Sequence, residues 1–162
     1  MLHFNNFLLF LLQPADNSHT ANLKFIIMEL QYESKFSKLF YDAERSFIKA
    51  VRKGDTENMS DEDYRNDMLA LLDILKEKKA THVLMDNSEF HFTIAVELQD
   101  WASQHIVIPA AENGLRRLAF IESNDIFANV SSRQAMEVKR GETLTFRYFD
   151  DKEKAVKWLF ED

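Results

Sequence analysis

The stretch SDEDYRNDMLALLDILKEKKATHVLMD, residues 60–86, decides the fold class of this chain. Ser60 and Asp63 occupy the positions of a capping box, which begins a helix. Apolar residues then recur at helical spacing and share one face, namely Tyr64, Met68, Leu71, Leu72 and Leu75. The run from His82 to Asp86 is short and apolar, which is typical of a strand buried on both faces of a sheet. A helix that leads directly into such a strand predicts an α/β protein.

The rest of the chain continues this alternation. Residues 35–41 and 47–51 predict two strands of an antiparallel hairpin, and residues 118–121 and 143–149 predict two further strands. Three further helices are expected. The first follows Thr93, which would cap it, the second covers residues 125–138, and the third begins after Asp150 or Asp151. Pro109 should interrupt or end the first of these helices. We therefore expect an α/β fold with a mixed, largely parallel sheet of about five strands, in the order β-β-α-β-α-β-α-β-α, with helices packed on it.

The first 27 residues differ from the rest. Phe7 to Leu12 reads FLLFLL, which is too short to cross a bilayer, since this takes about 20 residues. No Lys or Arg precedes Lys24, unlike in a secretory signal. We interpret residues 1–27 as an extension that need not be native, and residues 28–162 as a single domain. The alternative is a short helix that docks on the domain.

Composition excludes several functions. The net charge of −7 argues against nucleic-acid binding, which usually needs a basic stripe. The three glycines are far apart, at positions 54, 114 and 141, so neither a P-loop nor a dinucleotide fingerprint is possible. The absence of cysteine excludes disulfides and thiol catalysis, and it fits a cytoplasmic location.

Four local segments carry a family resemblance, and they are TENMSDEDY (56–64), FHFTIAVELQDW (90–101), FANVSSRQAM (127–136) and RYFDDKEKAVKWL (147–159). Together with the order of elements they resemble the STAS domain, and most closely its small stand-alone bacterial relatives, the SpoIIAA-like group. This group is described as sharing its shape with the CRAL-TRIO lipid-transfer fold. The resemblance covers about residues 30–162. It implies a STAS-like fold and a regulatory role, whereas most members of the group lack an assigned activity.

The phosphoserine switch of anti-sigma-factor antagonists does not carry over to this chain. If Asp86 matches the acidic residue that ends the central strand of these relatives, the switch position falls near Ala95 or Val96. Neither residue has a hydroxyl group, and Glu97 stands at the adjoining glycine position. Thr93 is the nearest hydroxyl, followed by Ser88, and a helix cap is the favoured role for Thr93.

The segment after the central strand is the candidate functional surface, because ligand crevices form at the carboxyl ends of strands in open sheets. We expect it to contact a partner through Asn87, Ser88, Glu89, Phe90, His91, Phe92, Thr93 and Glu97. Asp86, Glu89 and His91 offer metal-ligand atoms, but loop solvation explains them better. A serine triad from Ser88, His91 and Asp86 is rejected, since residues so close in sequence rarely reach triad geometry. We therefore expect no catalytic residue, no metal and no cofactor.

Two functions remain open. The favoured one is a non-enzymatic regulatory or protein-interaction domain, whose partner is another protein or a second copy in a homodimer. The alternative is a module for a small apolar ligand or a lipid, although a normally packed core of this size leaves little volume for a lipid. An apolar pocket or a partner groove could be lined by Phe90, Phe92, Trp101, Phe127 and Met136, although plain core is the favoured role for such residues. The Phe90 and Phe92 pair is the exception, because it lies in a loop.

Overall fold

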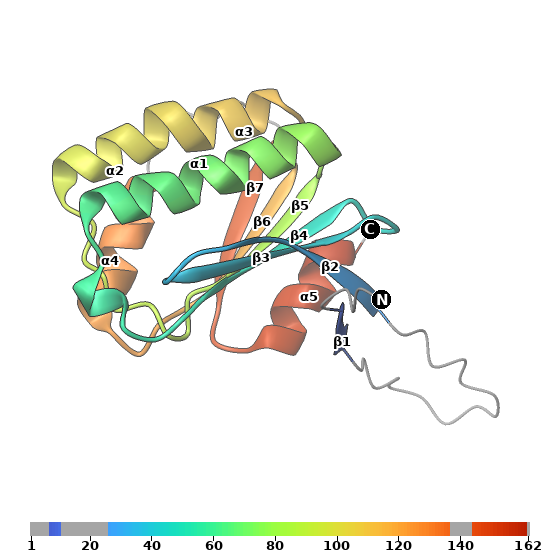
Figure 1. Cartoon of the computed structure of the whole chain (residues 1–162), viewed down its shortest axis with the longest axis horizontal. Helices are drawn as coiled ribbons and strands as arrows, with labels where there is room; N and C mark the ends of the chain where they lie inside the picture. Colours follow the sequence, from blue (N-terminus) through green and yellow to red (C-terminus); the bar gives the residue numbers. More distant parts are fainter. Residues whose placement is uncertain (1–6, 11–25, 137–143, 162) are drawn as a thin grey trace, which may run out of the picture.

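The computed structural model describes residues 7–10, 26–136 and 144–161, and its strands form one sheet (Figure 1). The spatial order of the strands follows the chain. They are β1 (Phe7–Phe10), β2 (Ile26–Glu33), β3 (Ser37–Asp42), β4 (Phe47–Arg52), β5 (His82–Asp86), β6 (Arg117–Ile121) and β7 (Thr145–Phe149). From β1 to β4 neighbouring strands are antiparallel, and from β4 to β7 they are parallel. The α/β class, the mixed sheet and the β3–β4 hairpin are thus confirmed.

The sheet has two more strands than expected, β1 and β2, within the described part of the chain. In β2, Met28 is buried while Ile27 and Glu29 are exposed, which is the alternation of a strand with one face on the core. Strand β1 pairs with β2, from Phe7 opposite Glu29 to Phe10 opposite Ile26. A helix is therefore wrong for Phe7–Phe10, and the boundary expected after residue 27 falls inside β2. The division of the chain into extension and domain stays a prediction.

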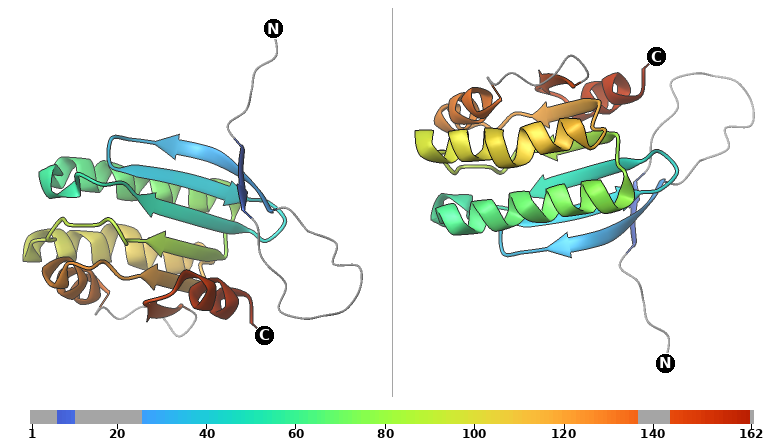
Figure 2. Two further views of the ribbon diagram at one scale, coloured as in Figure 1. Left: turned by 90° about the horizontal axis from the view of Figure 1, so that it is seen from below. Right: turned by 90° about the horizontal axis from the view of Figure 1, so that it is seen from above.

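The helices form two layers (Figures 1 and 2). On one face of the sheet, α1 (Asp61–Lys78) lies beside a continuous helix made of α2 (Val96–Ala102), the π-helical turn η2 (Ser103–Val107) and α3 (Ile108–Glu112). Helix α4 (Ile126–Ala135) packs against α2, and α5 (Lys152–Phe160) covers the other face. The parallel strands β4 to β7 follow one another across the sheet in chain order. Because crossovers between parallel strands are almost always right-handed, the helices that connect these strands lie on the same face of the sheet.

One of the expected helix boundaries is wrong. Thr93 does not cap a helix, because α2 begins at Val96 after Ala95 and has no side-chain cap. The interruption expected at Pro109 is present. The α-helical pattern changes to the π turn η2 directly before Pro109 and resumes as α3, with Pro109 in its first turn. The caps at Ser60 and Asp151 are confirmed. Asp125 caps α4, and the expected end of this helix at residue 138 lies outside the described residues.

The central strands are buried on both faces. On β5, Val83 and Met85 pack under α1, η2 and α3, while Leu84 faces Ala155 and Leu159 of α5. The expected apolar face of α1 is confirmed, since Tyr64, Leu71, Leu72 and Leu75 are buried and Met68 is partly buried. Burial on both faces explains why the sequence of β5 is apolar throughout rather than alternating.

A buried ion pair crosses the interface between α1 and the sheet. The Nη1 atom of Arg52, the last residue of β4, lies 2.9 Å from Oδ2 of Asp67 on α1, and both side chains are almost fully buried. The hydroxyl groups of Ser37 and Tyr32 also donate to the Asp67 carboxylate. The Arg52 guanidinium lies 5.2 Å from the centre of the Phe90 ring and 5.7 Å from that of Tyr64. One arginine thus joins the sheet, α1 and the segment after β5.

Replacing Leu72 with Ala should lower the free energy of unfolding by about 2–5 kcal/mol, because the side chain is only 4% exposed in the core under α1. Chemical denaturation measures this change directly. The matched control is Leu69→Ala on the same helix, where Leu69 is 41% exposed and the cost should stay near the surface value of about 0.5 kcal/mol. Equal costs at the two positions would show that the wrong face of α1 has been placed on the sheet.

Candidate functional site

The carboxyl ends of β4, β5 and β6 meet at one end of the sheet, beside the N-terminal ends of α1, α2 and α4 (Figure 1). Parallel strands place their following loops at the same edge, which is where open α/β sheets form ligand and partner sites. The segment 87–95 after β5 lies at this end, as the sequence predicts. Its backbone turns where the Phe90 N–H donates to the Asn87 carbonyl.

The structure divides the predicted contact residues into buried and accessible ones. Phe90 is only 2% exposed and packs in a cluster with Phe36, Tyr64 and Leu98, so it is wrong as an exposed anchor. Asn87 is buried as well. Phe92 is partly buried and stacks on Tyr64 at 5.7 Å between ring centres. Helix α1 and Arg52 pack against this segment and cover Phe90 and part of Phe92. This packing explains why two large aromatic side chains occur in a loop.

The other predicted contact residues remain accessible to a partner. Glu89, Thr93 and Glu97 are exposed, and Ser88 and His91 are partly exposed. The Nδ1 atom of His91 lies 3.8 Å from Oδ2 of Asp125, the N-cap of α4. This pair brings the segment next to the start of α4.

Thr56 holds the segment in place, a role that the sequence analysis missed. Its side chain is fully buried, and its hydroxyl donates to the Glu89 carbonyl at 3.0 Å and accepts from the His91 N–H at 2.8 Å. Both bonds join the loop before α1 to the segment after β5. The bonds join segments that are far apart in the sequence, so no local pattern indicates this anchor.

Asp86 is engaged on the α5 side of the sheet. Its carboxylate lies 2.7 Å from Nζ of Lys152 and accepts a bond of 2.8 Å from the Ser88 hydroxyl. Burial by itself would raise the pKa of Asp86, but the bonds from Lys152 and Ser88 outweigh it and hold the pKa below its usual value. Lys49 is buried nearby, and burial together with the Lys152 charge lowers the pKa of Lys49 to about 8 although Asp86 opposes the shift.

The side chains considered as metal ligands have other partners. Asp86 contacts Lys152, while His91 contacts Asp125. Over the residues that the structure describes, no three His, Cys, Asp or Glu side chains form a group that could hold a metal ion. The Asp67 carboxylate on α1 is paired with Arg52.

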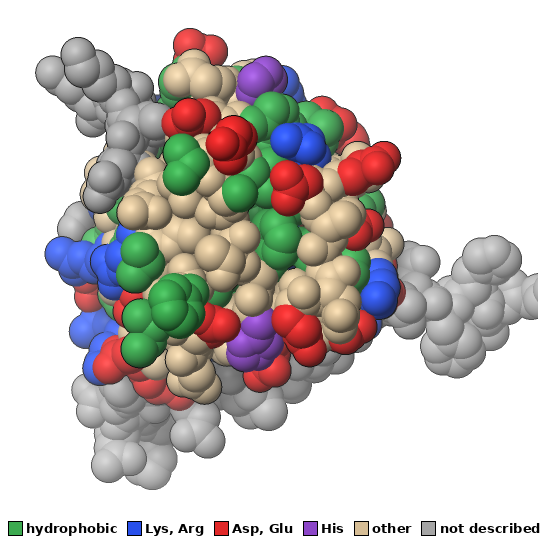
Figure 3. All heavy atoms as spheres, turned by 90° about the vertical axis from the view of Figure 1, so that its left-hand side faces the viewer, with side chains coloured by type: hydrophobic (Ala, Val, Ile, Leu, Met, Phe, Trp, Pro, Cys, Tyr) green, Lys and Arg blue, Asp and Glu red, His purple; other side chains and the backbone are tan. Residues whose placement is uncertain are grey.

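An apolar patch lies on the surface at this end of the sheet. Ile126 and Phe127 are each 74% exposed on α4, Val130 is 48% exposed one turn later, and Val96 at the start of α2 is 65% exposed. Figure 3 shows this face, with hydrophobic side chains gathered at the lower left and both acidic and basic side chains around them. Phe127 was considered above as lining an apolar pocket or a partner groove, and its exposure excludes core packing. We call these four residues the apolar patch.

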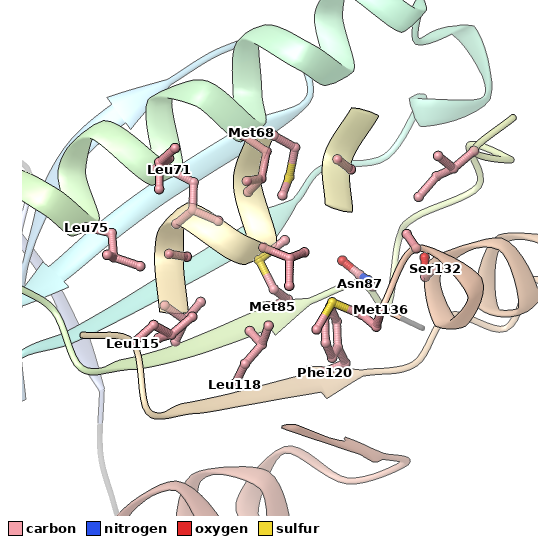
Figure 4. Close-up of a pocket in the computed structure, with 18 of the residues that line it drawn as sticks. Met68, Leu71, Leu75, Met85, Asn87, Leu115, Leu118, Phe120, Ser132 and Met136 are labelled. Atoms are coloured by element: carbon pink, nitrogen blue, oxygen red, sulfur yellow. The ribbon is translucent and has the colours of Figure 1, made fainter. Parts of the chain in front are cut away.

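A cavity of about 70 Å³ lies between α1, the helix α2–η2–α3 and the sheet (Figure 4). Phe90 and Met136 line it, as considered above, together with Asn87 and Arg52. The Nε atom of Arg52 and the Oδ1 atom of Asn87 are buried and have no hydrogen-bond partner. The cavity volume of about 70 Å³ is about half of the roughly 150 Å³ of an apolar cavity that can hold benzene, so it is far too small for a lipid chain.

Raising the pH from 8 to 10 should increase the contribution of Lys49 to stability. The pKa of Lys49 is lowered from 10.5 to about 8 in the folded protein, so in this range the unfolded chain binds more protons than the folded one. The free energy of unfolding therefore rises with pH, by at most about 3 kcal/mol from this residue.

The measurement is urea denaturation at several pH values for the wild type and for Lys49→Met, which should lack this rise. Lys76→Met, at an exposed position on α1, is the control and should keep the rise. Identical pH profiles for the wild type and Lys49→Met would contradict the assignment.

No helix in the described ranges is both long enough and apolar enough to cross a membrane. Searches of curated proteins and of solved structures each returned no match. The family model described as SpoIIAA-like matches residues 55–160, from the loop before α1 to the end of α5, which is well over half of the chain. This match confirms the resemblance seen in the sequence: the chain belongs to the SpoIIAA-like family, with a STAS-like α/β domain.

Proposed function

We propose that this chain is a non-enzymatic protein-interaction domain of the STAS type, and that the apolar patch is its contact surface. Membership in the SpoIIAA-like family supports a regulatory role of this general kind. One fold can carry many different functions, so a feature of the site must support the proposal, and here a single observation does so. This observation is the gathering of exposed hydrophobic side chains at the carboxyl end of the parallel strands.

Most of the exposed large hydrophobic side chains lie at this end. The described part of the chain exposes six of them, and four form the apolar patch. Single exposed hydrophobic residues are normal, but several together on one face are typical of a surface that contacts a partner. The other two, Ile27 and Leu69, lie elsewhere, on β2 and α1.

Hydrogen bonds connect the two helices that carry the apolar patch. The Gln99 amide of α2 donates to the Gln134 side chain of α4 at 3.2 Å, and the Ile94 N–H donates to the Ser131 hydroxyl at 3.1 Å. These bonds hold α2 and α4 together, so a partner would meet a preformed surface. Glu97 and Asp100 are exposed on α2, and Arg133 is exposed on α4. A partner with an apolar centre and a charged or polar rim would complement this surface.

The contact surface lies close to the place that corresponds to the phosphoserine of related domains. If Asp86 matches the acidic residue that ends their central strand, this position falls near Ala95 or Val96, and Val96 belongs to the apolar patch. We infer that this chain lacks the phosphoserine switch and that an apolar contact takes its place. A reducing, cytoplasmic location fits a chain without cysteine. The lipid alternative is disfavoured, because the cavity is too small for a lipid chain.

The test is site-specific photo-crosslinking in cells. Replacing Phe127 with the photoreactive residue p-benzoylphenylalanine keeps an aromatic side chain at an exposed position, so the fold should persist. Ultraviolet light should then join the domain to a discrete partner, which mass spectrometry identifies. An adduct with a second protein or with another copy of the chain supports the proposal, and the mass of the adduct separates the two.

The matched control carries the same photoreactive residue at Leu69, which is exposed on α1 outside the patch. It should yield none of the adducts found at position 127. If position 127 gives no discrete adduct, or gives the same adducts as position 69, then the patch is not a contact surface and the proposal fails.

A further inference from the structure

We propose that the cavity under α1 binds a small, neutral, apolar molecule that carries a hydroxyl group. This inference goes beyond the proposed interaction role and does not depend on the apolar patch. It rests on two residues of a largely apolar lining that each carry a buried polar atom without a hydrogen-bond partner, which is an arrangement that core packing alone does not explain.

The walls of the cavity are apolar and adaptable. Leucines from α1, β6 and the loop before it surround the space, together with Phe120 (Figure 4). Met68, Met85 and Met136 also line it, from α1, from β5 and from the end of α4. Methionine side chains are unbranched and change shape easily, so a cavity of about 70 Å³ can widen around a small ligand. Such walls favour an apolar body over water.

The polar atoms define the ligand's head group. In Arg52, Nη1 bonds to Asp67 and Ser37, and Nη2 lies 3.3 Å from the Met68 sulfur, whereas the buried Nε has no partner. In Asn87, the buried Oδ1 has none. Both residues line the cavity. An unpaired buried donor or acceptor costs about 1–3 kcal/mol, so the two atoms favour an occupant that satisfies both.

A hydroxyl group meets both requirements, because it accepts a hydrogen bond from Nε and donates one to Oδ1. A carboxylate can only accept and an ammonium can only donate. The charge of Arg52 is already balanced by Asp67 at 2.9 Å, so the site has no need of an anion. The ligand class is therefore an alcohol or a phenol with a small apolar body.

The experiment titrates the full chain with phenol and with benzene, and follows binding by calorimetry and by amide chemical shifts. Phenol should bind at least about ten times more tightly than benzene, because only phenol can satisfy the two polar atoms. The amides that shift should belong to residues around the cavity, such as those of β5 and the end of α4. This comparison uses the wild-type protein and needs no variant.

Asn87→Leu supplies the second arm. It replaces the unpaired acceptor with an apolar group of similar size, so the domain should fold, and phenol should lose about tenfold in affinity while benzene binding stays unchanged. Asn124→Leu, at an exposed asparagine, is the control and should leave both affinities as they are. If phenol does not bind, water is the only occupant and the proposal is overturned. If phenol and benzene bind equally to the wild type, the polar atoms do not select the ligand and the proposal is equally overturned.

Discussion

The buried pair of Arg52 and Asp67 is the interaction on which the rest of the structure depends. Charges so deeply buried are tolerated only when each is paired and hydrogen-bonded. Asp67 meets this condition with Arg52, Ser37 and Tyr32, which come from three neighbouring strands. The pair therefore sets the position of α1 relative to β2, β3 and β4. Apolar packing alone would be less directional, since hydrophobic contacts fix no single orientation.

The same arginine connects the core to the functional end of the molecule. Its guanidinium lies against the ring of Phe90, and Thr56 holds the backbone on either side of that ring. Together they keep the segment after β5 against the body of the domain. The His91–Asp125 contact brings this segment next to α4, where the apolar patch begins. Both the patch and the cavity thus depend on one supporting framework.

The sequence was sufficient for the fold class but not for the functional surface. Helix α1 and strand β5 could be predicted because their apolar patterns match the periods of a buried helix and a buried strand. Asp67 lies on the apolar face of α1, which was an available signal of a buried partner. In α4 the pattern misleads, because Ala128, Ser131, Ser132 and Ala135 face inward and larger residues face solvent. Tertiary contact with α2, which no local pattern reveals, decides which face of α4 is buried.

A double-mutant cycle on Arg52 and Asp67 tests the central claim most directly. Arg52→Met, Asp67→Leu and the double variant are compared with the wild type by chemical denaturation. We expect each single change to cost about 3–5 kcal/mol, because it leaves one charge buried without its partner. The double variant should cost far less than the sum of the two. Single costs below about 1 kcal/mol that simply add in the double variant would contradict this account.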